Sequence, residues 1–425
     1  MVLLVVGVGS CGKADFPTGG RVHLDYTDSI GYHFVRDGEP FLVRGVSGIQ
    51  RLPLLKEYGG NTVRNYRPED LPAVLDLADS LGIAVIADLP LPAFARYSDP
   101  DGGDLREMQD SLLRTVERFR HHPALLCWML GNELFYSGYT SGYQSAYNEI
   151  ARAVRAADPD HPISTTIIPQ QLASVLLSWE GLSIDFYSFN VFGNFESLKQ
   201  LQFWAAPLWR GPYLVSEWSY NGPWETDKTA WGAPVEDSSP AKARHLRERY
   251  LVNVAGTDDP RRMGNLAFFW GNKYERTPDW YSFFDEEGTI SEMAWELGNR
   301  WNHRSDSFPG PQLYYIMLEG KGATENLLLP SSTPVRATST FLHPPAEDYT
   351  AVWEVRREDW LGEGQIGEAP PPLSLPFTQG TVDGASFVTP RQPGPYRLYC
   401  RIYDQGGYFS SANVPFYVLN TRDAE

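Results

Sequence analysis

The sequence has little cysteine, a shortage of basic residues and no long apolar run. Only three of its 425 residues are cysteines, and their spacing matches neither a disulfide framework nor a metal site. Lysine and arginine total 36 against 53 acidic residues, and the resulting net charge of −17 argues against the basic patch that a nucleic-acid partner requires. No apolar run approaches the ~20 residues of a membrane-spanning helix. We therefore expect no metal, no other cofactor and no nucleic-acid partner.

Aromatic residues, by contrast, are abundant. The chain has 13 Trp, 23 Tyr and 21 Phe, which together make up 13% of its residues. Aromatic faces pack on the C–H faces of sugar rings, and they also fill large hydrophobic cores. Composition alone favours neither explanation over the other.

Residues 1–20 resemble an export signal followed by a tether. Val2 to Val8 form a short apolar stretch, and Gly9, Ser10 and Cys11 follow it. The run that ends at Cys11 is similar to a bacterial lipobox, in which the cysteine is acylated after cleavage. No lysine or arginine precedes the apolar stretch, although a signal peptide normally begins with a positive charge. From this likeness we expect a lipid anchor at Cys11 and a periplasmic, outer-membrane or cell-surface location in a bacterium.

Residues 21–304 alternate between short β-type runs and amphipathic helices, which is the pattern of parallel strands joined by helical crossovers. Several β-type runs are apolar throughout, as strands buried on both faces are. One helical stretch runs from Pro72 to Leu81 and stops at Gly82. The candidate strands are Leu42–Ser47, Thr62–Tyr66, Ala84–Leu89, Leu125–Leu130, Ile163–Ile168, Phe186–Val191, Tyr213–Ser216 and Asn265–Trp270. Eight strands with crossovers favour a (β/α)8 TIM barrel over an open sheet.

The periodicity changes after about Arg304. A polar linker with proline and glycine follows, and helical spacing then disappears. Between Tyr396 and Ile402 apolar residues alternate with more polar ones, which is typical of a half-buried antiparallel strand. We predict that residues 312–420 form a small all-β domain, an immunoglobulin-like sandwich. Cys127 and Cys400 lie in apolar stretches and are predicted core residues.

Two glutamates stand at the ends of predicted strands. Active sites in barrels of this type lie at the C-terminal ends of the strands. The fourth strand leads into Asn132 and Glu133, and the seventh leads into Glu217. Glycoside cleavage requires two facing carboxyl groups, one to protonate the leaving oxygen and one to attack the anomeric carbon. The alternative is that each glutamate only pairs with a nearby arginine. Asp88 also ends a strand, and we expect it to be structural.

The motifs around these glutamates resemble a known family. The runs Cys-Trp-Met-Leu-Gly-Asn-Glu at 127–133 and Val-Ser-Glu-Trp at 215–218 are similar to the clan A retaining glycoside hydrolases, and most similar to the TIM-barrel domain of glycoside hydrolase family 2. Supporting likenesses are Gly-Glu-Pro-Phe-Leu-Val-Arg-Gly-Val at 38–46, Gly-Asn-Thr-Val-Arg at 60–64, Phe-Trp-Gly-Asn-Lys at 269–273 and Thr-Pro-Asp-Trp at 277–280. The resemblance covers about residues 30–300.

The resemblance implies a role for each candidate residue. Glu133 is expected to be the acid/base and Glu217 the nucleophile. Asn132 is expected to hydrogen-bond the 2-hydroxyl of the substrate, and Arg64 to lie beneath Glu217 and hold it ionised. The expected aromatic residues around the sugar are Trp270 as the floor of the subsite, and Tyr66, Trp231 and Trp280 as its walls. An ordinary ion pair for Arg64 and plain core packing for Trp270 are the alternatives.

One position departs from the family pattern. Family members usually carry a tyrosine after the sixth strand, and its hydroxyl bonds the nucleophile. This chain has Phe192 at that place. Tyr187 and Tyr220 are the candidate substitutes, unless the contact is missing.

These residues support one main functional prediction and two alternatives. The main prediction is a retaining β-glycosidase that cleaves β-linked glucans or related oligosaccharides by double displacement through a glycosyl-enzyme. A β-glucanosyltransferase would use the same two glutamates, and Asn-Thr-Val-Arg at 61–64 has a general likeness to fungal enzymes of that class. The third hypothesis is a non-catalytic surface lipoprotein that binds glycans. In each case the partner is an oligosaccharide or a polysaccharide.

Overall fold

The structure is a computed structural model that describes residues 21–93, 101, 103–136, 138–177, 181–193, 195, 198–200, 210–358, 369–375 and 377–420. Cys11 and the rest of residues 1–20 lie outside the described residues. The lipid anchor and the exported location therefore stay predictions.

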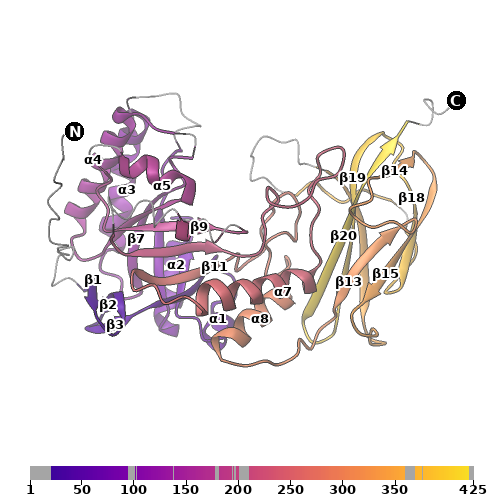
Figure 1. Ribbon diagram of the computed structural model, residues 1–425, viewed down its shortest axis with the longest axis horizontal. Coiled ribbons are helices and arrows are strands. Elements are labelled where there is room, and N and C mark those ends of the chain that lie inside the picture. The colour runs from indigo at the N-terminus through magenta and orange to yellow at the C-terminus, as the bar shows by residue number, and fades with distance from the viewer. Residues whose placement is uncertain are drawn as a thin grey trace, which may run out of the picture.

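A closed barrel of eight parallel strands forms the larger part of the described chain (Figure 1). Each strand pairs with its neighbours in sequence, and the last strand closes on the first. The barrel strands are β4 (Val43–Ser47), β5 (Thr62–Asn65), β6 (Ala84–Leu89), β7 (Leu125–Asn132), β8 (Ile163–Ile167), β9 (Phe186–Val191), β10 (Tyr213–Trp218) and β11 (Arg262–Phe268). All eight predicted strands are barrel strands, so the predicted (β/α)8 barrel is confirmed.

Helices lie on the outside of the barrel, and the sequence sets where several of them begin and end (Figure 1). Helix α2 ends at Gly82, whose φ of 66° is left-handed and suits glycine. Helix α4 begins after Thr140, whose hydroxyl accepts the N–H of Tyr143 at 3.2 Å. The helices are α1 (Leu52–Glu57), α2 (Leu71–Leu81), α3 (Gly103–Phe119), α4 (Ser141–Ala157), α5 (Pro169–Leu177), α7 (Ser239–Arg249), which continues into a π-helical turn (Tyr250–Ala255), and α8 (Glu292–Trp301).

A small antiparallel sheet covers the end of the barrel where the strands begin. Its strands are β1 (Val22–Thr27), β2 (Gly31–Arg36) and β3 (Glu39–Phe41). Val22, Leu24 and Phe34 of this sheet share a buried cluster with apolar residues near the start of the barrel strands. Burial of this apolar surface stabilises the closed end. The opposite end, where the strands finish, is left for polar residues.

Two packed β-sheets follow the barrel and enclose a separate hydrophobic core. In one sheet β20 pairs with β19, which pairs with β16, and β14 also pairs with β20; the other sheet has the order β13, β15, β18, β17. The strands are β13 (Leu313–Leu318), β14 (Leu327–Pro330), β15 (Pro334–Phe341), β16 (Thr350–Arg357), β17 (Thr378–Thr381), β18 (Gly384–Val388), β19 (Gly394–Tyr403) and β20 (Tyr408–Leu419). The prediction of C-terminal antiparallel sheets after the barrel is confirmed, and Cys127 and Cys400 are both buried as predicted.

The barrel and the C-terminal sheets are joined by hydrogen bonds as well as by packing. The short strand β12 (Ile290–Ser291) pairs with β20, and α7 and α8 lie between the two parts (Figure 1). Arg401 on β19 donates to both carboxylate oxygens of Asp279 at 3.0–3.1 Å. Asp279 lies in the segment after β11, so the sheets contact a loop that follows the last barrel strand.

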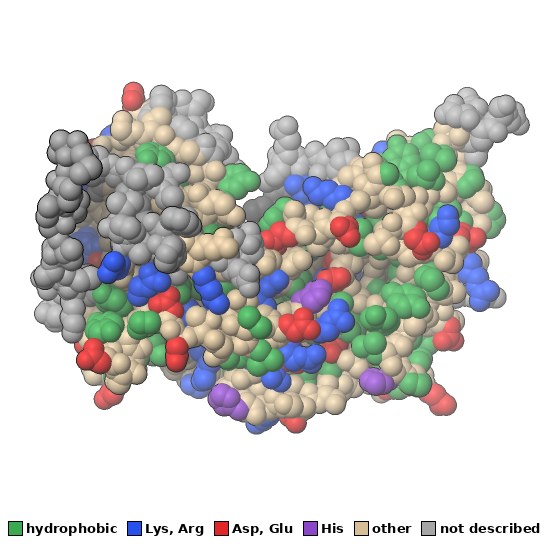
Figure 2. Space-filling view, viewed as in Figure 1, with side chains coloured by type: hydrophobic (Ala, Val, Ile, Leu, Met, Phe, Trp, Pro, Cys, Tyr) green, Lys and Arg blue, Asp and Glu red, His purple; other side chains and the backbone are tan. Residues whose placement is uncertain are grey.

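Among the described residues, no helix is both long and apolar enough to cross a membrane. On the face shown in Figure 2, acidic and basic side chains are interspersed over the region between the barrel and the sheets.

Candidate active site

Polar side chains gather at the C-terminal ends of the barrel strands. Because neighbouring strands are parallel, these ends meet at one rim. The side chains are Arg64 on β5, Asp88 on β6, Asn132 and Glu133 at the end of β7, Asn190 on β9 and Glu217 on β10. The structure therefore brings together the two glutamates, the arginine and the asparagine that the sequence analysis singled out.

Arg64 connects three of these side chains. Its guanidinium is fully buried and donates two parallel hydrogen bonds to Asp88, at 2.9 and 2.7 Å. It also donates to Glu217 Oε1 at 3.0 Å and to Asn132 Oδ1 at 2.9 Å. The two parallel hydrogen bonds of the guanidinium thus go to Asp88, whereas Glu217 receives a single hydrogen bond from Arg64. Asp88 orients Arg64 toward Glu217, which gives this structural residue a positioning part in the site.

Glu217 is buried and receives a second donor. Only 6% of Glu217 is exposed, and the hydroxyl of Tyr66 donates to the same Oε1 atom at 2.9 Å. Burial raises the pKa of Glu217 to about 7, while the charge of Arg64 and the Tyr66 hydrogen bond act in the opposite direction. The carboxyl of Glu133 raises the pKa further, because two nearby negative charges repel. Without Arg64 and Tyr66, Glu217 would be harder to ionise.

Glu133 has no charged hydrogen-bond donor among the described residues. Its Oε1 atom accepts from the amide of Asn190 at 2.7 Å, and the Asn190 carbonyl accepts from the hydroxyl of Ser216 at 2.8 Å. Burial raises the pKa of Glu133, and the Asn190 hydrogen bond opposes this shift. The backbone of Glu133 is left-handed, with φ of 51°, and its N–H donates to the carbonyl and the hydroxyl of Thr166, both at 3.0 Å. The turn that follows β7 is thereby fixed to β8.

Asn132 is oriented by hydrogen-bond donors on strands β5 and β8. Its Oδ1 atom accepts from Arg64 at 2.9 Å and from the hydroxyl of Thr166 at 2.7 Å. Since both partners are donors, this oxygen end faces the rim of the barrel and the amide nitrogen faces the cleft. Asn132 is exposed there and offers a hydrogen-bond donor to a ligand.

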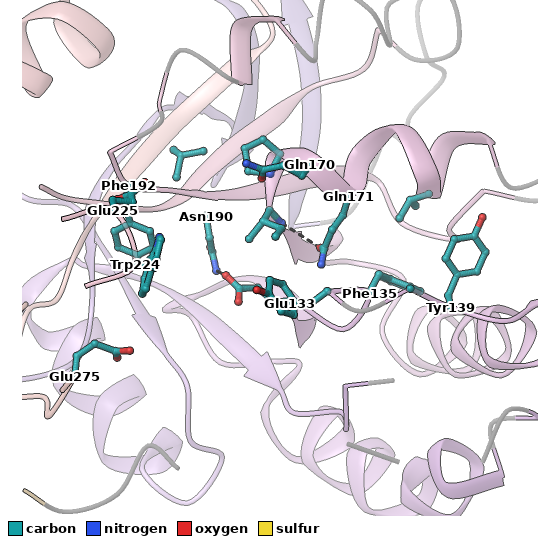
Figure 3. A pocket seen from close by; sticks show the side chains of 16 residues that line it. Glu133, Phe135, Tyr139, Gln170, Gln171, Asn190, Phe192, Trp224, Glu225 and Glu275 are labelled. Atoms are coloured by element: carbon teal, nitrogen blue, oxygen red, sulfur yellow. Dashed lines mark hydrogen bonds between the residues drawn. The ribbon is translucent and has the colours of Figure 1, made fainter. Parts of the chain in front are cut away.

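The strand ends open into a cleft with two connected parts. The smaller part, which we call the Glu217 cavity, has a volume of about 600 Å³ and is lined by Glu217, Asn132, Tyr66 and Lys273 among others. The larger part, the Gln171 cavity, measures about 930 Å³ and extends past Phe135, Tyr139 and Gln171. Glu133, Phe192, Trp224 and Glu275 line both parts. Figure 3 shows Glu133 between the side chains of Phe192 and Trp224 on one side and Phe135 and Tyr139 on the other.

Three of the predicted aromatic residues do not line this cleft. Trp270 is fully buried and packs against Phe283 and Phe284 behind the barrel rim, so it is a core residue and no subsite floor. Trp280 is 1% exposed, and its ring N–H donates to the carbonyl of Asn221 at 3.0 Å. Trp231 packs against Tyr417 of β20, with ring centroids 5.8 Å apart. The structure therefore does not place these three tryptophans at the floor or walls of the two cavities.

Other aromatic residues take their places. Phe268 and Phe269, directly before Trp270, line the Glu217 cavity together with Tyr281. Trp224 lines both cavities and is 56% exposed, which is unusual for so large an apolar side chain. The run of successive aromatic residues at 268–270 was visible in the sequence, but which of them faces the cleft depends on where β11 ends. Trp224 lies in a segment without periodicity, and no sequence signal pointed to it.

The departure at Phe192 is compensated from a different strand. Phe192 does lie in the cleft and packs on Trp224, Phe268 and Tyr281, so it offers no hydroxyl to Glu217. Neither proposed substitute replaces it: Tyr220 donates to the carbonyl of Trp280, and no hydrogen bond links Tyr187 to Glu217 among the described residues. Tyr66, predicted only as a wall, supplies the hydroxyl instead.

Metal ligation is not indicated by the side chains. Within the described ranges, no three His, Cys, Asp or Glu side chains come close enough to hold a metal ion. The acidic residues of the cleft are instead paired with arginine, lysine, tyrosine or amide groups.

The fold and the site together define a class: a (β/α)8 barrel whose fourth strand leads into the half-buried Glu133 and whose seventh strand carries the buried Glu217, both facing one cleft. Residues 46–218 match the family described as "Glycosyl hydrolases family 2, TIM barrel domain". The matched part of the chain contains Arg64, Glu133 and Glu217, and therefore both glutamates of the cleft.

Several known proteins are similar to this chain over part of their length. "Beta-galactosidase 2" of Enterobacter cloacae is 26% identical over 148 residues, which is 30% of this chain and 14% of that protein. Among solved structures, β-glucuronidase 2 of Bacteroides uniformis, covalently bound to cyclophellitol-6-carboxylate aziridine, is similar with a TM-score of 0.51 at 15% identity, covering 94% of this chain and 48% of that one. The family 2 β-galacturonidase of Eisenbergiella tayi, bound to galacturonate, gives a TM-score of 0.51 at 17% identity, covering 68% and 55%. The two structural likenesses concern the fold, and the chain spans about half the length of these solved proteins.

Proposed function

We propose that the chain is a retaining β-glycosidase in which Glu133 is the acid/base and Glu217 is the nucleophile. The observation that carries this proposal is the unequal environment of the two carboxyl groups. Glu217 receives a charged and a phenolic donor, which both favour its ionised form. Glu133 receives only an amide bond, from Asn190. Burial raises the pKa of both carboxyl groups, so the donors, and not burial, distinguish them. Two carboxyl groups whose surroundings differ in this way can divide the roles of acid and nucleophile.

The reaction uses each group in turn. Protonated Glu133 gives its proton to the glycosidic oxygen while the Glu217 carboxylate attacks the anomeric carbon, so the carbon–oxygen bond breaks and a glycosyl ester forms on Glu217. Glu133, now ionised, then takes a proton from water, and the water oxygen replaces Glu217 at the anomeric carbon. The outward-facing amide of Asn132 donates to the 2-hydroxyl, a contact that strengthens in the transition state.

We further propose that the sugar on the nucleophile side is neutral. Among the residues described around the Glu217 cavity, each basic side chain already has a carboxylate partner. Arg64 pairs with Asp88 and Glu217, and Lys273 pairs with Glu275. Arg67 pairs with Glu69 and Asp70 at the exposed rim. A sugar carboxylate would therefore have to displace an existing ion pair, at the cost of an unpaired charge.

This charge balance separates the named relatives into two groups. A β-galactoside has a neutral sugar, whereas a glucuronide or a galacturonide carries a carboxylate. The paired cations support a neutral glycone, as in the first group. The β-linked glucan expected from the sequence belongs to the same neutral class, and it stays a prediction.

Stereochemistry tests the proposed mechanism directly. A β-linked aryl glycoside of a neutral sugar is hydrolysed in an NMR tube, and the first-formed sugar is followed before mutarotation. Double displacement predicts that the β-anomer appears first. Immediate appearance of the α-anomer would show inversion, and the assignment of Glu217 as a nucleophile would be wrong.

A further inference from the structure

The larger half of the cleft has no part in the chemistry described so far. The Gln171 cavity shares Glu133 with the Glu217 cavity, but Glu217, Arg64 and Asn132 do not line it. The nucleophile must lie beneath the sugar that it attacks, while the acid must reach the oxygen that leaves. Under the proposed function, on which this inference rests, the leaving group therefore extends into the Gln171 cavity.

Gln171 presents a buried hydrogen-bond donor to this space. It lies at the start of α5, directly after barrel strand β8, and only 6% of it is exposed. Its Oε1 atom accepts the backbone N–H of Ile168 at 3.2 Å, as the dashed line in Figure 3 shows. That bond fixes the side-chain carbonyl toward the backbone, so the amide nitrogen is directed away from it and toward the cavity (Figure 3).

The amide nitrogen of Gln171 has no hydrogen-bond partner among the described residues. A buried donor without a partner is energetically unfavourable, and this one belongs to a residue that lines the cavity. A ligand hydroxyl in the Gln171 cavity would satisfy it. Aromatic side chains lie around the same space: Tyr136 is 69% exposed and Trp224 is 56% exposed, and both line the cavity. A pyranose ring can pack its C–H face on an exposed aromatic side chain, and one of its hydroxyl groups can accept a hydrogen bond from a buried donor.

The charged residues of the Gln171 cavity are already engaged. Glu225 accepts the backbone N–H groups of Gly193 and Gly222 at 2.8 and 2.7 Å, and Glu275 pairs with Lys273. No basic side chain lines this cavity among the described residues. The space therefore suits a neutral group, and its volume of about 930 Å³ is near the upper end of the range for small-molecule sites.

We propose that the Gln171 cavity is a leaving-group subsite for a neutral sugar, and that the Gln171 amide donates a hydrogen bond to one of its hydroxyl groups. The substrate is then an oligosaccharide in which both sides of the scissile bond are sugars. Gln171 acts as a specificity residue, because it contacts the leaving group and not the anomeric carbon.

Paired substrates with the same glycone test this subsite. One is a β-linked disaccharide and the other is the 4-nitrophenyl β-glycoside, whose leaving group has no hydroxyl for Gln171. Gln171→Met removes the donor and keeps the volume. Gln171→Glu removes the donor but keeps the oxygen that accepts the N–H of Ile168. This variant therefore tests loss of the ligand bond without loss of the bond to Ile168. In both variants the ratio of kcat/KM for the disaccharide to kcat/KM for the aryl glycoside should fall about tenfold or more.

Gln312→Met is the matched control, because Gln312 bonds Glu292 at the junction with the C-terminal sheets, away from the cleft. Its ratio should equal that of the wild type. An unchanged ratio in both Gln171 variants would overturn the subsite while aryl glycoside hydrolysis still upholds the proposed function. Failure of the wild type to hydrolyse any β-glycoside would overturn the function, and the subsite with it.

Discussion

At the scale of single residues, the nucleophile candidate is controlled from one strand end. Arg64 and Tyr66 are two residues apart at the end of β5, and both donate to Oε1 of Glu217. The guanidinium also lies over the Tyr66 ring, 4.3 Å from its centroid. One short segment therefore supplies the charge and the hydroxyl that favour ionised Glu217.

Tyr66→Phe should make Glu217 harder to ionise. The ring stays over Arg64, but the hydrogen bond to the carboxylate is lost, and such bonds to charged groups contribute about 1.5–3 kcal/mol. The pKa of Glu217, about 7, should therefore rise by roughly one to two units. Because the nucleophile acts in its ionised form, the acid limb of the kcat/KM–pH profile should move to higher pH.

Tyr220→Phe is the control for this change. Tyr220 is also a buried tyrosine, but its hydroxyl donates to the backbone of Trp280. The acid limb of the kcat/KM–pH profile of Tyr220→Phe should coincide with that of the wild type. If Tyr66→Phe leaves the limb in place, the hydroxyl of Tyr66 does not support Glu217.

Glu275→Gln should change which sugars are accepted. Loss of the Glu275 carboxylate leaves Lys273 without its ion-pair partner in the Glu217 cavity, so a sugar carboxylate gains a free cation. The ratio of kcat/KM for a β-uronide to that for the matching neutral β-glycoside should rise about tenfold. Glu149→Gln, which breaks the exposed pair with Arg106 outside the cleft, should leave the ratio unchanged. A wild type that already prefers the uronide would contradict the neutral-glycone proposal.

The sequence predicted which charged residues meet, but not how each aromatic side chain points. Glu133, Glu217, Arg64 and Asn132 follow apolar strands, and parallel strands bring such positions to one rim. Trp270 was misplaced because a run of neighbouring aromatic residues gives no periodicity that tells an inward from an outward side chain. The bond from Tyr66 to Glu217 joins residues on non-adjacent strands, and local patterns carry no information about such pairs.

At the scale of elements, the barrel strands were the most predictable feature. β6 and β9 have the predicted bounds, because each is a continuous buried run with turn residues on both sides. Two other strands differ from the prediction in their bounds. β7 continues to Asn132, and β11 begins at Arg262, three residues before the predicted start. The sheet β1–β3 was not predicted as a unit, since its strands are short and are defined by their packing against the barrel.

The turn that ends β7 holds Glu133 in a conformation that favours other residues. A left-handed backbone is unfavourable for glutamate and tolerated by asparagine. Burial of the Glu133 carboxyl adds a desolvation cost. Glu133→Asn should therefore raise the free energy of unfolding by about 1 kcal/mol while activity on unactivated substrates is lost. Chemical denaturation and kinetics on the same preparation measure both effects.

His303→Asn provides the comparison, because His303 has φ of 54° and is exposed outside the cleft. It should gain a little stability and keep full activity. A lower unfolding midpoint for Glu133→Asn than for the wild type would show that no strain is stored at this strand end.

At the scale of the whole molecule, the C-terminal sheets support a loop of the barrel and take no direct part in the cleft. None of the described residues from 312 onward lines either cavity. Arg401 instead holds Asp279, which is 2% exposed and adjoins Trp280 and Tyr281. Tyr281 lines the Glu217 cavity, so the sheets reach the site through this segment.

Arg401→Met should destabilise the junction. Asp279 would keep a buried charge without its partner, and removal of one member of a buried pair costs about 3–5 kcal/mol. The midpoint of denaturant-induced unfolding should fall accordingly. Arg106→Met, which removes an exposed ion pair with Glu149, should cost less than about 1 kcal/mol. Equal effects of the two substitutions would contradict a structural role of the junction.

In the proposed reaction Glu217 forms a covalent bond to the sugar in the first step. A 2-deoxy-2-fluoro β-glycoside of a neutral sugar with a good leaving group slows the second step more than it slows the first, so the glycosyl-enzyme accumulates. Proteolysis and mass spectrometry then locate the added mass. The account predicts one fluorosugar per chain, on the peptide that contains Glu217, and no label in Glu217→Gln. A label on any other residue, or turnover with inversion and no covalent adduct, would contradict it.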